Sequence, residues 1–106
     1  MLDMIKNAMG LGSTVDYTEM KKRNALILDV RSRAEFQSGH FKDAKNIPLD
    51  ELSNHIASLK KEERPIITCC MSGARSGAAA RQLEAEGIEA HNGGNWSQLG
   101  NAYHQA

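Results

Sequence analysis

One stretch, Cys70-Met71-Ser72-Gly73-Ala74-Arg75-Ser76, decides the fold of this chain. An apolar run at residues 65–69 precedes it, and an alanine-rich run at residues 76–87 follows it. The first run predicts a buried strand, and the second predicts a helix that a glycine ends. Gly73 allows backbone angles that larger residues resist, so the N–H groups of the loop can converge on one point. The stretch therefore predicts a strand, a tight loop and a helix, with the sulfur of Cys70 at the mouth of the loop.

The position of Cys70 predicts a reactive sulfur. The field that binds anions at helix N-termini also favours a thiolate, and a thiolate is a nucleophile. We therefore predict a nucleophilic sulfur in a pocket that fits an oxyanion or a polysulfur group. The alternative is a buried cysteine that acts as a small hydrophobe. Cys69 lies one residue earlier and points to the other face of the strand. We predict that Cys69 is a packed core thiol, with a resolving thiol as the alternative.

Short strands and helices alternate along the rest of the chain. The continuous apolar run at residues 25–30 predicts a second strand that is buried on both faces, as in a parallel sheet. Residues 13–15 and 88–91 predict two weaker strands, residues 46–49 a short extended segment, and Gly93-Gly94 a turn. This alternation predicts an α/β domain with a mostly parallel sheet. Ligands bind at the carboxyl ends of the strands in such sheets, which is where the cysteine loop falls.

Polar residues mark the expected helix starts. Asp16 and Ser32 each precede a glutamate with the spacing of a capping box. Asp50 is expected to cap a third helix, and Asn95 begins a last one. We expect the charged run at residues 60–64 to form a solvated loop.

Length and composition narrow the class of protein. The 106 residues fit one domain at residues 13–106, after an N-terminal extension at residues 1–12 that has the apolar face of a short helix. The 13 basic and 13 acidic side chains balance, which argues against a nucleic-acid partner. Two adjacent cysteines cannot build a disulfide framework, so we expect a reducing, cytoplasmic location. No apolar run approaches the length of about 20 residues that a membrane span needs, and no cluster of cysteines and histidines suggests zinc.

Two motifs stand in order along the chain. The first contains Leu28-Asp29-Val30-Arg31, Glu35-Phe36, Gly39-His40-Phe41 and residues 44–49. The second contains the Cys70 loop, Gly93-Gly94 and Trp96. Together they resemble the single-domain rhodanese-like family, of the thiosulfate sulfurtransferase type, over about residues 13–100. The resemblance implies a three-layer α/β domain in which helices flank a mostly parallel sheet of five strands.

The resemblance also implies sulfur transfer through a persulfide on Cys70, the catalytic residue. The substrate-binding loop would then consist of Met71, Ser72, Gly73, Ala74, Arg75 and Ser76. Asp29 and Arg31 are candidates for bracing this loop or its arginine from behind, and a plain cap at the end of its strand is the alternative for Asp29. Arg31 has the spacing to pair with Glu35. The implied partners are a small sulfur donor such as thiosulfate and a thiol or cyanide acceptor, without a cofactor or a metal. We expect a monomer.

Three alternatives to this enzyme remain open. The same persulfide can serve a protein-to-protein sulfur carrier, with a protein as donor or acceptor and little small-molecule turnover. A cysteine phosphatase or arsenate reductase also places a thiolate in an anion-binding loop, but the resemblance implies that its loop is one residue longer than the six from Cys70 to Arg75. A non-catalytic interaction module is expected to lack the cysteine. The apolar Met71 favours a persulfide or thiol donor over thiosulfate.

Overall fold

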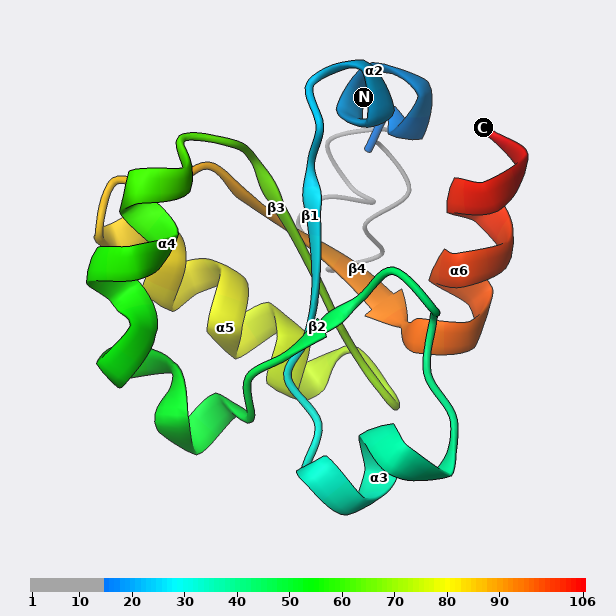
Figure 1. Cartoon of the computed structure of the whole chain (residues 1–106), viewed down its shortest axis with the longest axis horizontal. Helices are drawn as coiled ribbons and strands as arrows, with labels where there is room; N and C mark the ends of the chain where they lie inside the picture. Colours follow the sequence, from blue (N-terminus) through cyan, green and yellow to red (C-terminus); the bar gives the residue numbers. More distant parts are fainter. Residues whose placement is uncertain (1–14) are drawn as a thin grey trace, which may run out of the picture.

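Helices cover both faces of one sheet in this protein (Figure 1). The structure is a computed structural model, and it describes residues 15–106. The predicted extension at residues 1–12 lies outside the described residues, as does most of the predicted strand at residues 13–15. No helix of the described part is long and apolar enough to cross a membrane. Along the chain the elements are α2 (Tyr17–Lys22), β1 (Leu26–Asp29), α3 (Arg33–Ser38), β2 (Lys45–Asn46), the 3-10 helix η1 (Leu49–His55), α4 (Ile56–Glu62), β3 (Ile66–Cys70), α5 (Ala74–Ala85), β4 (Ala90–Asn95) and α6 (Trp96–Gln105).

The sheet has the strand order β2-β1-β3-β4, and each neighbouring pair is parallel. The predicted α/β class with a parallel sheet is confirmed. Four strands pair within residues 15–106, whereas the resemblance implied five. Val15, the described residue of the expected first strand, is not in a strand. Because the strands all run the same way, their carboxyl ends meet at one edge of the sheet.

The two central strands, β1 and β3, are buried along their whole length. This explains their continuous apolar sequences, because neither face of the sheet meets water. Helices η1, α4 and α5 lie on one face of the sheet, and α2 and α6 lie on the other (Figure 1). Their apolar side chains pack into a separate core cluster on each face. Successive strand residues point to opposite faces, so Cys70 joins the first cluster and Cys69 joins the second. Each fully buried leucine or isoleucine in these clusters contributes about 1.5–3 kcal/mol to stability.

Side-chain caps begin two helices as predicted. Asp16 accepts a hydrogen bond from the backbone N–H of Glu19 at 3.1 Å, at the start of α2. Ser32 and Glu35 form a complete capping box at the start of α3, with each side chain accepting from the other residue's backbone N–H. Such caps satisfy N–H groups that have no partner within the helix, and each contributes about 0.5–2 kcal/mol.

The segment from Pro48 to Glu63 differs from the prediction. Asp50 caps no helix, because the turn already begins at Pro48, whose carbonyl accepts from the N–H of Glu51 at 2.9 Å. The fixed φ of proline suits this first turn. Residues 60–62 continue α4 instead of forming a loop, since lysine and glutamate favour helix and lysines suit its C-terminal end. The helix ends at Glu63, which has a left-handed φ of 52°.

β4 runs straight through the two glycines that were predicted to form a turn. Gly93 is required by close packing: a Cβ there would lie 2.8 Å from both Cγ2 of Ile67 and the carbonyl oxygen of Thr68. The β3–β4 pairing shifts register between Thr68 and Cys70, and Cys70 then pairs with Asn95. The end of β4 is thereby placed directly beside the cysteine loop.

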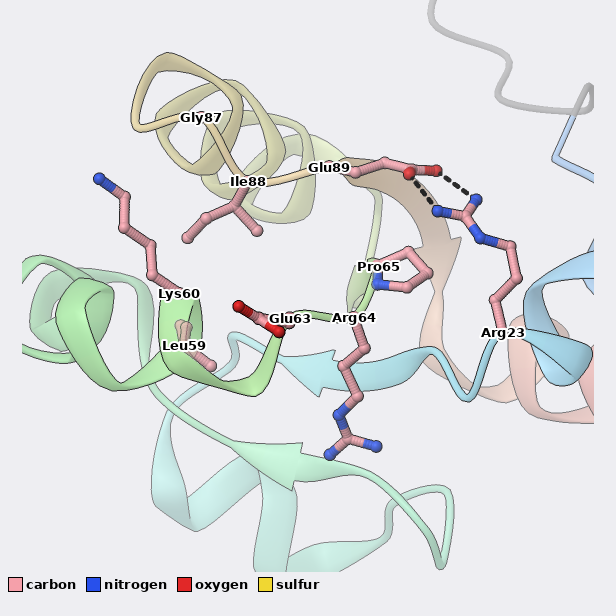
Figure 2. A pocket seen from close by; sticks show the side chains of 9 residues that line it. All are labelled: Arg23, Leu59, Lys60, Glu63, Arg64, Pro65, Gly87, Ile88 and Glu89. Atoms are coloured by element: carbon pink, nitrogen blue, oxygen red, sulfur yellow. Dashed lines mark hydrogen bonds and ion pairs between the residues drawn. The ribbon is translucent and has the colours of Figure 1, made fainter.

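A pocket of about 290 Å³ lies at the amino ends of the strands (Figure 2). Its walls come from the segments that precede β1, β3 and β4. Arg23 and Glu89 form a bidentate ion pair on one side of the pocket, with N–O distances of 2.9 and 2.6 Å. This pair ties the end of α2 to the start of β4. The pocket therefore lies at the opposite edge of the sheet from Cys70.

Candidate active site

The sulfur of Cys70 lies where β3 ends and the chain turns into α5. Its Sγ accepts hydrogen bonds from the backbone N–H of Gly73 at 3.0 Å and of Ser76 at 3.4 Å. The hydroxyl oxygen of Ser76 lies 3.3 Å from the same sulfur. Gly73 caps α5 with a φ of 98°, a conformation that favours glycine and that turns the loop back over the strand. The loop N–H groups thus converge on one atom, at the positive end of a helix of 12 residues.

The burial of Cys70 differs from the prediction that its sulfur lies at the mouth of the loop. Cys70 is 0% exposed, whereas Met71 is 51% exposed and forms the outer rim. The strand continues through Cys70 itself, which draws the sulfur below the loop instead of leaving it on the surface. The apolar rim at Met71 is present as the sequence suggested.

Burial and hydrogen bonding act in opposite directions on the Cys70 thiol. Burial raises its pKa, because a charge is poorly solvated there. The Ser76 hydroxyl and the backbone N–H groups of Ser76, Gly73 and Ser72 outweigh this effect, and the pKa lies below its ordinary value. The loop therefore favours the thiolate, the form that attacks sulfur or phosphorus.

Cys69 is a packed core thiol, as predicted. Its side chain is 0% exposed and packs with Ile27, Ile67 and Leu99 on the α2 and α6 side of the sheet. Burial, followed by the nearby carboxylate of Asp29, raises the pKa of Cys69 to about 12. This thiol stays protonated at neutral pH.

Asp29 and Arg31 form a buried ion pair behind the loop. Both oxygens of Asp29 accept from the guanidinium, at 3.0 and 3.1 Å from Nε and 2.7 Å from Nη2. Arg31 also donates to the carbonyl of Gly39 at 2.8 Å, and its guanidinium lies 4.5 Å above the Trp96 ring. The hydrogen-bonded partner of the Asp29 carboxylate is Arg31, whose side chain folds back onto it, and not Arg75. The pair instead fixes the segment after β1 against α6.

The sequence suggested that Glu35 pairs with Arg31, but its ion-pair partner is Arg75. The two N–O distances are 2.7 and 3.0 Å, whereas Arg31 reaches only the backbone carbonyl of Glu35, at 3.4 Å. Hydrogen bonds from Arg75, and then from Ser32, lower the pKa of Glu35 to about 2. Glu35 therefore stays ionised at neutral pH and cannot act as a general acid. Arg75 belongs to the Cys70 loop, so the pair ties this loop to α3.

Two asparagines that sequence reasoning missed support the loop from β4. Asn92 donates from Nδ2 to the carbonyl of Gly73 at 3.1 Å, and its Oδ1 accepts from the hydroxyl of Ser76 at 2.7 Å. Asn95 donates to the carbonyl of Met71 at 2.8 Å. Asn95 was expected only to begin the last helix, which it does by accepting from the first N–H groups of α6. The available signal was their position at the carboxyl end of a strand that follows the cysteine strand.

A groove of about 520 Å³ lies beside the loop and shares Arg75 with it. Val30, Pro48 and Leu49 supply apolar atoms to its lining, and the ion pair of Arg33 and Glu51 also lines it. The groove has room for the organic part of a small molecule. In the described part of the chain, no group of three or more His, Cys, Asp or Glu side chains is arranged to hold a metal ion.

Comparisons with known proteins identify the family. Residues 14–96 match the family described as Rhodanese-like domain. The chain belongs to the rhodanese-like family. Its α/β domain is similar to a rhodanese-like domain protein from Staphylococcus aureus, with a TM-score of 0.62, 30% identity and coverage of 74% of this chain and 82% of that one. A structure described as rhodanese with anions from E. coli gives a TM-score of 0.63 and 29% identity, over 69% of this chain and 88% of that one.

The description of a curated relative does not state an activity. The uncharacterized protein YqhL of Bacillus subtilis is 37% identical over 65 residues, which is 61% of this chain. The match covers 51% of YqhL, so the rhodanese-like chain spans about half the length of that relative. Family membership therefore supports a protein of the sulfurtransferase type, without specifying its substrates.

Proposed function

We propose that this protein is a sulfurtransferase in which Cys70 carries sulfane sulfur as a persulfide. The observation that carries the proposal is the convergence of the Gly73 and Ser76 N–H groups on the Cys70 sulfur at the start of α5. These donors favour the thiolate, and a thiolate needs no general base to attack. The low pKa of Glu35 agrees with chemistry that uses no carboxylic acid.

With thiosulfate as the donor, the Cys70 thiolate attacks the outer sulfur of the donor. A bond forms between Sγ and this sulfur, the sulfur–sulfur bond of thiosulfate breaks, and sulfite leaves with its electron pair. The persulfide then carries one negative charge on its outer sulfur. In the second half, cyanide or a thiolate attacks the outer sulfur, and Sγ leaves as a thiolate. The products are thiocyanate or a small persulfide, and no external oxidant or proton is needed.

The surroundings of the loop favour an organic persulfide or thiol-derived donor over free thiosulfate. Thiosulfate carries two negative charges, but the cation of the loop, Arg75, is already paired with Glu35. The exposed rim at Met71 and the groove beside Arg75 both offer apolar atoms to an organic donor. We therefore expect a lower KM for such a donor than for thiosulfate.

The direct test is mass spectrometry of the peptide that contains Cys70. After incubation with a sulfur donor and removal of excess donor, we expect a gain of one sulfur on Cys70, which cyanide then removes as thiocyanate. Hydrolysis of a generic aryl phosphate is measured on the same sample, and we expect none. Phosphatase activity that depends on Cys70, without a persulfide from any donor, would contradict the proposal and favour a cysteine phosphatase.

A protein-to-protein sulfur carrier is the second candidate. The exposed Met71 favours it, because a large apolar side chain at the rim of a reactive loop suits contact with another protein. A carrier would show the same persulfide but slow release of thiocyanate or of small persulfides. Turnover with small acceptors, measured on the persulfide form, separates the carrier from the enzyme.

A further inference from the structure

The hydroxyl of Ser76 lies between two atoms that can each accept its proton. Its oxygen lies 3.3 Å from Sγ of Cys70 and 2.7 Å from Oδ1 of Asn92. A hydroxyl has one proton, so it donates to one of these atoms at a time. Ser76 is 0% exposed, so water does not compete with these two atoms for the proton.

The amide of Asn92 can face Ser76 in only one orientation. Its Nδ2 donates to the carbonyl of Gly73 at 3.1 Å, and its Oδ1 accepts from the N–H of Gly94 at 3.0 Å. A flipped amide would set NH₂ against N–H and oxygen against oxygen. Gly77 in the first turns of α5 leaves room for the amide, since a Cβ there would lie 3.1 Å from Nδ2. The oxygen of Asn92 is therefore held toward the hydroxyl.

We propose that Asn92 is a positioning residue for Cys70, whose Oδ1 holds the Ser76 proton while the sulfur is uncharged and releases it when the thiolate forms. In the thiol state the S–H donates to Ser76, and Ser76 donates to Asn92. In the thiolate state the hydroxyl turns to the sulfur, and Oδ1 keeps the N–H of Gly94. The Cys70 sulfur, the Ser76 hydroxyl and Oδ1 of Asn92 form a relay, and each has a hydrogen-bond partner in both states. The change from thiol to thiolate therefore requires only rotation of the hydroxyl.

No neighbouring charged group is hydrogen-bonded to the side chain of Ser76 or Asn92 in the described part of the chain. On the elements packed against the loop, the titratable groups are Asp29 and Arg31 at the end of β1, Glu35 of α3, Cys69 of β3, Arg75, Arg81 and Glu84 of α5 and His91 of β4. Arg81 comes nearest to the Asn92 amide, since its Nη1 would lie 3.6 Å from a Cβ at Gly77. Asp29 is paired with Arg31, Glu35 with Arg75, and His91 with Glu89. No hydrogen bond joins these groups to the side chains of Ser76 or Asn92 within residues 15–106. The position of the Ser76 proton therefore follows the charge of Cys70.

The test is a double-mutant cycle on the pKa of Cys70. Ser76→Ala, Asn92→Ala and the double variant are made in a Cys69→Ala background, and the ultraviolet absorbance of the thiolate is titrated against a Cys70→Ser blank. Ser76→Ala should raise the pKa. Asn92→Ala removes the competitor for the Ser76 proton, so it should lower the pKa more when Ser76 is present than it does in the Ser76→Ala background. We expect a coupling of about half to one pKa unit, the size of one hydrogen bond.

Additive pKa changes in the two backgrounds would overturn the proposal. Asn92→Val serves as a second variant if Asn92→Ala fails to fold, because a β-branched residue suits the strand. It also lacks the competing acceptor, so it should give a coupling of the same sign. The link to sulfur transfer rests on the proposed function, but the titration needs no sulfur donor. A missing coupling thus counts against Asn92 alone, and a missing persulfide counts against the proposed function alone.

Discussion

Cys69 and Cys70 are neighbours in β3, and both are 0% exposed, yet their thiol pKa values move in opposite directions. Cys69 faces apolar side chains of α2 and α6, and burial raises its pKa to about 12. Cys70 faces the start of α5, where Ser76 and loop N–H groups donate to its sulfur and hold the pKa below the ordinary value. The two thiols therefore differ in pKa although both are shielded from solvent. The difference lies in which face of the strand meets hydrogen-bond donors.

Substituting each cysteine in turn should give the largest effect, because the two variants should differ strongly in sulfur transfer. Cys70→Ser should lower sulfur transfer by more than about a thousandfold, since it removes the proposed nucleophile. Cys69→Ala should retain most of the activity and lose about 0.5–3 kcal/mol of stability, as expected for a small cavity in the core. The measurements are thiocyanate release and unfolding by denaturant, with circular dichroism to verify folding. Equal losses of activity in two folded variants would contradict the assignment.

Glu35→Gln should have a smaller effect, on the free energy of unfolding, because it removes the ion pair that holds the cysteine loop to α3. The folded-state pKa of Glu35, about 2, lies below its ordinary value of 4.5, so the folded protein favours the carboxylate. The stability difference between wild type and variant should therefore be fully present above pH 4.5 and disappear as pH falls toward 2. The measurement is urea unfolding across this range.

Glu51→Gln is the matched control for Glu35→Gln, because Glu51 pairs with Arg33 in the neighbouring groove and not with a residue of the cysteine loop. It should leave the Cys70 pKa unchanged, whereas Glu35→Gln frees Arg75 beside the loop. Because the Glu35–Arg75 pair is partly exposed, the loss for Glu35→Gln should not exceed about 1 kcal/mol. A stability difference for Glu35→Gln that persists unchanged to pH 2 would contradict the ion pair with Arg75.

The fold and the cysteine loop were predictable because their signals are local. The apolar runs of β1 and β3, the capping box at Ser32 and the small residues after Cys70 all act over a few positions. The alternation of side chains along a strand was enough to separate Cys69 from Cys70. Gly93 was misread because it resembles a turn residue, although close packing requires it.

The partners of the loop were not predictable, because they depend on how distant segments meet. Arg75 and Glu35 are 40 positions apart, and nothing local distinguishes Glu35 as its partner from Asp29. The contacts of Asn92 depend on the register of β4, which the shift beside Cys70 sets. The capping box at Glu35 suggested a purely local role, and the same carboxylate also holds the loop.

The pH dependence of sulfur uptake tests the central role of the Cys70 thiolate most directly. The Cys69→Ala protein is mixed with excess thiosulfate, which stays fully ionised, and persulfide on Cys70 is followed by mass spectrometry at a series of pH values. The uptake rate should rise with pH and level off, with a midpoint below the value of about 8.5 for a free cysteine. A midpoint at or above that value would contradict the claim that the loop makes Cys70 the reactive sulfur.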